Sequence, residues 1–367
     1  MTPDFNGVPN LEKLILQGCT KLSKVHASIG NLKHLILLNL KDCKSLYSLP
    51  CKISLESLEI FILSGCSRLE KFPEIEGDMT RLSHLYLDGT AIRKLPLSME
   101  RLTGLTLFNL SNCKHLSSLP GVICSLLSLK TLTLSGCSKL GEMPENLGDA
   151  EGLEELDISG TAIRKAPSSI LLLKNLKLLS FHGCKGPPPK SWLLNCLLPS
   201  PDVSLMLPTS FSGLCSLTVL DLRDCNLLDG EIPNDFSGLS SLQYLDLSGN
   251  NFTSLPDSIS ELSQLRHLTV NNCSRLKSLP KLPISIFAVV AKGCASLETD
   301  SNEVNVWTSS ETGPAIVYCS RSTDHLDGSK THKISLPDAL SYSLLQRGLE
   351  VRFSLTHTHV HFRISIK

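Results

Sequence analysis

The side chains best suited to chemistry in this sequence are its 14 cysteines. Thiolates bind zinc, form disulfides and act as nucleophiles, but a zinc site needs clustered ligands such as C-x-x-C, and that spacing is absent. A reducing compartment would also keep such thiols free. Nine of them recur at one fixed place in a repeated phrase, which indicates a structural role: Cys19, Cys43, Cys66, Cys113, Cys137, Cys184, Cys225, Cys273 and Cys294.

Two further motifs could carry chemistry. His357, His359 and His361 would share one face of a strand, as zinc or copper ligands can, but no carboxylate or cysteine accompanies them, so we interpret them as a solvated or packed strand face. Asp327 to Thr331 (Asp-Gly-Ser-Lys-Thr) lacks the first glycine that a phosphate-binding loop needs. No Ser/His/Asp grouping stands apart from the repeat. We therefore predict no catalytic residue, no cofactor, no metal ion and no enzymatic activity.

The repeated phrase is L-x-x-L-x-L-x-x-(C/T/N), first seen from Leu11 to Cys19. Successive copies begin 23 to 25 residues apart, except for one step of 41 residues. A degenerate twelfth copy spans Ile286 to Cys294. This period is that of leucine-rich repeats. The eleven regular copies start at Leu11, Leu35, Leu58, Leu82, Leu105, Leu129, Leu153, Leu176, Leu217, Leu242 and Leu265.

Each half of the repeat predicts a local structure. The L-x-L alternation indicates a short strand with its leucines pointing inward, and strands from successive repeats would form a parallel sheet on the concave side. Leu-Pro pairs such as Leu95-Pro96, and S-I-x-x-L phrases such as 28–32, predict one turn of helix or 3₁₀-helix on the convex side. The predicted fold class is therefore an α/β solenoid, a leucine-rich-repeat horseshoe with a parallel concave sheet and a short β-rich C-terminal segment.

The ninth position of the phrase forms a predicted ladder of small polar side chains. Cys, Thr and Asn can each turn inward and donate to backbone carbonyls where the chain leaves the strand. Besides the nine cysteines, the ladder contains Thr90, Thr161 and Asn250. The remaining cysteines have no evident pairing, and we expect them to be small buried hydrophobes: Cys51, Cys124, Cys196, Cys215 and Cys319.

With this ladder, the phrases LILLNLKDCKSLYSLP (35–50), FILSGCSRLEKFPEI (61–75) and LYLDGTAIRKLPLSM (85–99) resemble a known family. The chain resembles the leucine-rich-repeat region of plant intracellular immune receptors of the TIR, nucleotide-binding, leucine-rich-repeat class. The alternation of "SGCS" with "DGTAI" repeats and the closing segment 279–299 carry the resemblance. It implies a sensor that binds a pathogen effector or a guarded host protein and restrains a nucleotide-binding domain. The TIR and nucleotide-binding domains of that family are not present in this sequence.

Composition limits the kinds of partner. The 35 basic and 35 acidic residues give a formal net charge of zero, so no global field favours nucleic acid or an anionic membrane, and we expect a protein partner. The N-terminus lacks the pattern of a secretory signal, and no run of apolar residues is long enough to span a membrane. These features favour a location in the cytoplasm or in the nucleus.

The repeats divide the sequence into five predicted parts. Residues 1–10 read as a partial repeat, 11–184 as repeats 1 to 8 and 215–298 as repeats 9 to 12. The Pro-, Ser- and Leu-rich segment 185–214 should loop out between the eighth and ninth repeats. In the β-rich segment 299–367, two alternating stretches have opposite parity, which predicts a bulge or turn near 356–359.

Recognition should use the outward strand positions, because the leucines are used by the core. The outward side chains turn acidic after the seventh repeat, which predicts a site for a basic or amphipathic protein. The predicted contact residues are Tyr86, Glu154, Glu155, Asp157, Asp221, Arg223, Asp224, Tyr244, Asp246, Arg266 and His267.

A second interpretation is the ectodomain of a cell-surface receptor. A Gly-Glu-Ile-Pro phrase at 230–233 is similar to extracellular plant repeats, and sequons begin at Asn109, Asn251 and Asn272. An enzyme that carries such repeats, for example a ubiquitin ligase, would need a catalytic domain for which no motif is present here.

Overall fold

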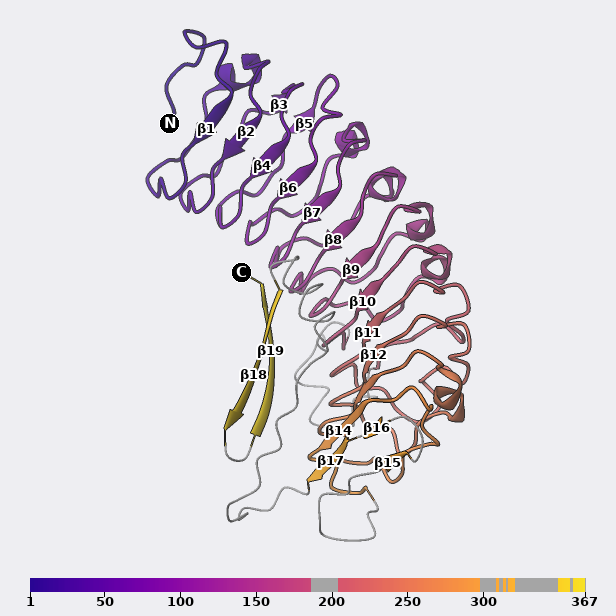
Figure 1. The fold of residues 1–367 in the computed structure, drawn as a ribbon. Coiled ribbons are helices and arrows are strands. Elements are labelled where there is room, and N and C mark those ends of the chain that lie inside the picture. Colours follow the sequence, from indigo (N-terminus) through magenta and orange to yellow (C-terminus); the bar gives the residue numbers. More distant parts are fainter. Residues whose placement is uncertain are drawn as a thin grey trace, which may run out of the picture. The chain divides into compact units, whose positions relative to one another are not determined.

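The computed structural model describes residues 1–185 and 204–297, together with the backbone of five strands between residues 308 and 366. It forms two compact units, Met1–Arg321 and Ser322–Lys367. Within the first unit, strands lie side by side along one side and 3₁₀-helices occupy the other (Figure 1). The predicted leucine-rich-repeat solenoid with a parallel sheet is confirmed. The described helical turns on the convex side are 3₁₀ rather than α.

Each repeat contributes one strand at its L-x-L position, and the neighbouring strands pair in parallel. The register is constant, so that the central residues of successive strands face one another, as Leu156 of β9 faces Leu179 of β10. These strands are β1 (Lys13–Ile15), β2 (Leu37–Asn39), β4 (Ile60–Ile62), β6 (His84–Tyr86), β7 (Leu107–Asn109), β8 (Thr131–Thr133), β9 (Glu155–Asp157), β10 (Leu178–Ser180), β11 (Val219–Asp221), β12 (Tyr244–Asp246), β13 (His267–Thr269) and β14 (Ala288–Lys292).

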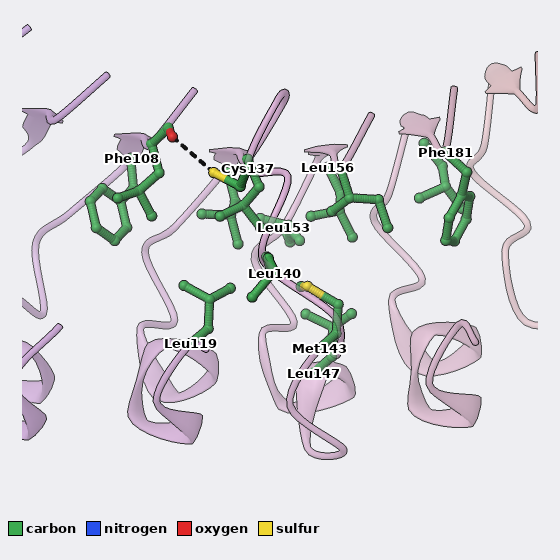
Figure 2. Close-up of a cluster of buried hydrophobic side chains, with 14 of the residues drawn as sticks. Phe108, Leu119, Cys137, Leu140, Met143, Leu147, Leu153, Leu156 and Phe181 are labelled. Carbon is green, nitrogen blue, oxygen red and sulfur yellow. Dashed lines mark hydrogen bonds between the residues drawn. The ribbon is translucent and has the colours of Figure 1, made fainter. Parts of the chain in front are cut away.

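The central residue of each strand points into a core shared by neighbouring repeats. Phe108, Leu132, Leu156 and Leu179 are each at most 2% exposed, whereas the residues on either side of them are half-buried, except for the buried Ser180. Because a repeat buries its apolar side chains mainly against the repeats next to it, the stack rather than the single repeat is the stable unit. Figure 2 shows this packing around Leu140, Met143 and Leu153.

The chain leaves each strand through a residue in the left-handed region, two positions after the strand's last inward leucine. A positive φ is tolerated best by Gly, Asn and Asp. The residue types at this position, one before the ladder, follow that rule throughout the twelve repeats: Gly18, Asp42, Gly65, Gly89, Asn112, Gly136, Gly160, Gly183, Asp224, Gly249, Asn272 and Gly293.

The convex side is built from short 3₁₀-helices, several of which follow a proline. Pro96, Pro120, Pro167 and Pro256 stand at N-caps with φ between −62° and −71°, the range that the proline ring imposes. The parallel pair β3 (Lys52–Ile53) and β5 (Glu74–Ile75) lies outside the main sheet. The helices are η1 (Ala27–Asn31), η2 (Leu97–Arg101), η3 (Gly121–Ser125), η4 (Leu147–Asp149), η5 (Ser168–Leu172) and η6 (Asp257–Glu261).

The sheet continues without a gap across the 41-residue step. β10 pairs directly with β11, with Ser180 opposite Asp221. Part of the segment expected to loop out instead joins the core, since Leu205 and Phe211 are at most 1% exposed and the amide of Leu205 donates to the carbonyl of Cys225. The expected boundary 185–214 is therefore too wide at its C-terminal end, because apolar side chains in 204–214 fill the convex half of the repeat. Residues 186–203 lie outside the described residues.

The C-terminal region differs from the expectation in one respect. The sheet does not end with the twelfth repeat, because β17 (Ile316–Ser320) pairs in parallel with β14 and uses its open edge. A short antiparallel pair, β15 (Thr308–Ser309) and β16 (Gly313–Pro314), precedes it. In the second unit, β18 (Leu349–Thr356) and β19 (His359–Ile366) form an antiparallel pair, so the break expected near 356–359 is present.

Residues 1–10 close the first repeat. Thr2 and Phe5 are about 5% exposed, and the Thr2 hydroxyl accepts from the amide of His26 at 2.8 Å. The amide of Phe5 donates to the hydroxyl of Ser28, which lies in η1. These contacts are the ones that a convex segment makes with the repeat after it.

Candidate recognition surface

The ladder side chains tie neighbouring repeats together beneath the sheet. Each buried ladder cysteine donates from its Sγ to a carbonyl of the preceding repeat, as Cys66 does to Leu40 at 3.2 Å. Cys137 donates in the same way to Leu110 at 3.1 Å, the bond drawn as a dashed line in Figure 2. Cys19, in the first repeat, is exposed. Thr90 and Thr161 instead contact the Sγ of the ladder cysteine in the repeat that follows, each at 3.3 Å. The ladder thus links neighbouring repeats from beneath and leaves the outward surface free to vary.

Asn250 makes the most extensive ladder contact. Its Nδ2 donates to the carbonyls of Leu222 at 2.8 Å and Leu247 at 2.7 Å. Its Oδ1 accepts from the amides of Cys225 at 3.2 Å and Leu227 at 3.0 Å. The residue is fully buried, so this one amide satisfies four backbone groups that water cannot reach.

Burial makes the ladder thiol of Cys66 a poor nucleophile. It raises the pKa of the Cys66 thiol to about 12, and it raises the pKa of Cys124, which lies off the ladder, to about 11. Cys51 and Cys215, which also lie off the ladder, were expected to be buried. Both are instead exposed at turns on the surface. Cys196 lies outside the described residues, and only the backbone of Cys319 is described.

The outward residues of neighbouring strands form rows. Asp157, Ser180, Asp221 and Asp246 lie in one row across β9 to β12, in strict register. The stacking of repeats therefore brings predicted contact residues that are far apart in the sequence together on one face. Asp157 accepts from the amide and hydroxyl of Ser159, at 2.9 and 2.6 Å, which fixes the orientation of its carboxylate.

Arg223 joins two carboxylates of this row. Its guanidinium donates to both oxygens of Asp221, at 2.9 and 2.7 Å, and its Nε lies 3.5 Å from Asp246. A two-pronged contact of this kind fixes the arginine in one geometry. Asp246 also accepts from the amide and hydroxyl of Ser248, yet burial raises the pKa of this carboxyl to about 6. The surface here is a network of mixed charge rather than a set of bare acids.

The position in front of each strand contributes cations that the sequence reasoning missed. Glu154 lies between Lys130 at 3.2 Å and Lys177 at 2.6 Å, and these ion pairs lower the pKa of its carboxyl. Its neighbour Glu155 lies within 3.5 Å of the hydroxyl of Thr131. Reading this position at the repeat spacing would have found both lysines, because they stand one repeat before and one repeat after Glu154.

Aromatic rings gather at the C-terminal end of the concave face. Tyr244 and His267 stack with centroids 4.7 Å apart and planes 3° apart, and Phe287 packs on His267 at 5.7 Å. Burial lowers the pKa of His267 to about 4, so this ring is neutral at pH 7. Arg266 is exposed beside them. Asp224 lies 3.3 Å from His182, on the other side of the aspartate row.

Tyr86 lies apart from the other predicted contact residues. It is on β6, in one row with Ile62 and Asn109, and its ring stacks on His84 with a centroid distance of 6.4 Å. The outward positions of this part of the sheet are mostly apolar, and Ile15 of β1 is 58% exposed. The structure therefore brings together the predicted residues of β9 to β13 and places Tyr86 in a second region.

The flank that follows the ladder is strongly basic. In repeats 1 to 8, the described residues among the seven that follow each ladder residue include twelve exposed cations but only two acids, Glu70 and Glu142. Glu70 is paired with one of the cations, Arg93, at 3.3 Å. The cations are Lys21, Lys24, Lys44, Arg68, Lys71, Arg93, Lys94, Lys114, Lys139, Arg164, Lys165 and Lys185. In repeat 9 the same segment carries Asp229 and Glu231 instead.

Among residues 1–185 and 204–297, no three His, Cys, Asp or Glu side chains form a group that could hold a metal ion. The side chains of His357, His359 and His361 lie outside the described residues. No helix in the described part of the chain is both long and apolar enough to cross a membrane.

Comparisons with known families and proteins agree with the repeat pattern. Residues 54–143 match the family described as "Disease resistance protein RPS4B-like, leucine-rich repeats", and residues 215–274 match "Leucine rich repeat". The TMV resistance protein N of Nicotiana glutinosa is 44% identical over 283 residues, which cover 77% of this chain and 23% of that protein. Disease resistance-like protein DSC1 of Arabidopsis thaliana is 41% identical over 302 residues, which cover 82% of this chain and 23% of that protein.

The chain thus spans less than a quarter of the length of these curated relatives. Among solved structures, "Plant peptide hormone receptor RGFR1 in complex with RGF2" superposes with a TM-score of 0.51 at 21% identity. That match covers 79% of this chain and 47% of the receptor chain. At this identity the likeness is one of fold.

Proposed function

We propose that this chain, a leucine-rich-repeat region related to those of plant disease-resistance proteins, binds a protein partner on the concave face of repeats 7 to 11. Leucine-rich-repeat proteins are in general protein-interaction modules rather than enzymes. In this proposal the chain has no catalytic activity of its own. It works in the cytoplasm, or in the nucleus, as the recognition part of a larger receptor.

The observation that carries the proposal is the cluster of prepared contact groups on β9 to β13. Tyr244 and His267 form a rigid aromatic platform, and the contact between Arg223 and Asp221 fixes charges beside it. Aromatic residues and arginine are the side chains that most often dominate binding energy at protein interfaces. Because these side chains are already held in one conformation before binding, less conformational entropy is lost when a partner binds.

The relatives suggest what the partner is. TMV resistance protein N and Disease resistance-like protein DSC1 are named for resistance to disease, so we infer a pathogen effector or a guarded host protein as the ligand. The same concave face would also restrain a nucleotide-binding domain until the ligand arrives. A partner with basic or amphipathic character fits best, because Asp157 has no cationic side chain bonded to it among the described residues.

The test is a binding screen followed by mapping. Purified chain is screened by surface plasmon resonance against cloned pathogen effectors and host proteins. For each binder, Tyr244→Ala should raise Kd by about 30-fold, since it removes the ring of the platform. Asp157→Lys should raise Kd by about tenfold, mostly through a slower association rate at low salt.

The matched control is Arg101→Glu, which reverses an exposed charge on η2 of the convex side and should leave Kd unchanged. Circular dichroism establishes that each variant is folded. Binders whose affinity is insensitive to both concave substitutions, or sensitive to Arg101→Glu, would show that the concave face of repeats 7 to 11 is not the recognition surface.

A further inference from the structure

We infer that the basic flank of repeats 2 to 6 is a second interaction surface. Its occupant is an acidic protein segment with one large apolar side chain. This surface is separate from the concave face, because its residues follow the ladder instead of lying on the strands. Arg68, Lys71, Lys94 and Lys114 are all exposed and form no ion pair with the described residues. The proposal stands on this row of cations and on a hollow among them.

The row of cations outnumbers the neighbouring acids. Glu70 is held by Arg93 at 3.3 Å, and Glu74 accepts from the hydroxyl of Ser98 at 2.5 Å. The chain as a whole has a formal net charge of zero, so this flank concentrates positive charge that is balanced elsewhere. A local positive field of this kind attracts acidic groups and raises their rate of association.

The hollow has a volume of about 740 Å³ and lies between the flanks of repeats 2 to 5. Pro50, Pro73 and Ala91 provide apolar lining, and the charged residues at the same hollow are Arg68, Lys71, Glu70 and Glu74. Tyr47 also lines it, is 49% exposed and has the ammonium group of Lys24 over its ring at 5.4 Å. A partly apolar concavity on a flank with more cations than acids fits a single anchor side chain flanked by carboxylates.

The two observations together favour a protein over other polyanions. Proteins that bind nucleic acid are usually basic overall, whereas this chain has equal numbers of basic and acidic residues. Nucleic acid or a lipid surface could bind to the cations but has no apolar side chain to place in the hollow. An acidic peptide can use both, because strands in a sheet lie about 4.8 Å apart and successive repeats therefore offer cations within reach of one extended segment.

The experiment uses the full chain and a labelled probe peptide of about ten residues, half of them glutamate, with one central tryptophan. Fluorescence anisotropy measures Kd at low salt. We expect binding that weakens as salt is added. Arg68→Glu combined with Lys71→Glu should raise Kd at least tenfold. Replacing the tryptophan of the peptide with alanine should raise Kd about fivefold, and Tyr47→Ala should abolish that difference between the two peptides.

The matched control is Arg101→Glu combined with Lys174→Glu, which changes the net charge equally at exposed sites on the convex side and should leave Kd unchanged. A single-stranded oligothymidylate and vesicles containing phosphatidylserine serve as competing polyanions. The inference is overturned if the flank and control variants weaken the peptide equally, if both peptides bind alike to the wild type, or if either polyanion binds more tightly than the tryptophan peptide.

Discussion

Repeats 2 to 5 and repeats 9 to 11 share one framework but present different surfaces. In both regions the strands pair in the same register, and inward leucines and a buried ladder hold the repeats together. The outward residues are mostly apolar around Ile62 in the first region, whereas in the second they form the network of Asp221, Arg223 and Asp246. The flank after the ladder is basic in the first region and carries Asp229 in the second. Framework and surface chemistry are therefore independent of each other in this fold.

The two regions also differ in how strongly the ladder ties them. The first region relies on single thiol contacts such as that of Cys66, and a thiol is a weak donor. The second contains Asn250 and its four hydrogen bonds. A ladder substitution should therefore cost more stability in the second region than in the first.

The largest effect is expected at the junction between repeats 7 and 8. A Cβ at Gly213 would lie 1.8 Å from the carbonyl oxygen of Leu171, a backbone atom that cannot move aside easily. Gly213→Ala should therefore destabilise the chain by about 3 kcal/mol or more and should separate its thermal unfolding into two transitions. Gly141→Ala, where a Cβ would meet nothing within 4 Å, is the control. Equal melting of both variants would mean that this close approach is not required.

The second effect compares the two kinds of ladder residue. Asn250→Ala leaves the buried amides of Cys225 and Leu227 without their acceptor, and should cost about 3 kcal/mol of unfolding free energy in a urea titration. Cys66→Ala removes one thiol contact from a buried site and should cost about 1 kcal/mol. If the cysteine variant proves the less stable of the two, the second region is not the more tightly tied.

The smallest effect is a pH dependence confined to the second region. Because burial raises the pKa of Asp246 to about 6, above the value of about 3.9 in an unfolded chain, the folded state holds this proton more tightly. The stability contributed by this group is present below pH 4 and is lost as pH rises to about 6. Urea titrations should show wild type losing roughly 1 kcal/mol relative to Asp246→Asn between pH 4 and pH 7, a value reduced for solvent because the side chain is 29% exposed.

The matched control for this prediction is Asp235→Asn. Hydrogen bonds from Ser237 lower the pKa of Asp235, so wild type should gain stability relative to this variant as pH rises, which is the opposite sign. A difference between wild type and Asp246→Asn that does not change with pH would show that the network ionises like exposed carboxylates.

Much of the fold could be predicted from the sequence, for a local reason. The L-x-L spacing alone determines which side chains point inward, and the ninth position determines where a donor meets a carbonyl. The strands, the 3₁₀-turns after proline and the ladder were therefore predictable one repeat at a time. The left-handed position before the ladder, occupied by Gly, Asn or Asp in every repeat, was an equally local signal that the sequence analysis did not use.

Only the tertiary structure decided which side chains of different repeats contact one another. The sequence placed Asp221 and Asp246 in an acidic group, but only the stacking brings Arg223, which bonds to Asp221 of its own repeat, to within 3.5 Å of Asp246 in the next repeat. Lys130 and Lys177 reach Glu154 from neighbouring repeats in the same way. The sequence determined the direction of each side chain, because that depends on its own strand. Their partners depend on which residue the next repeat places about 5 Å away, and this is decided only when the repeats stack.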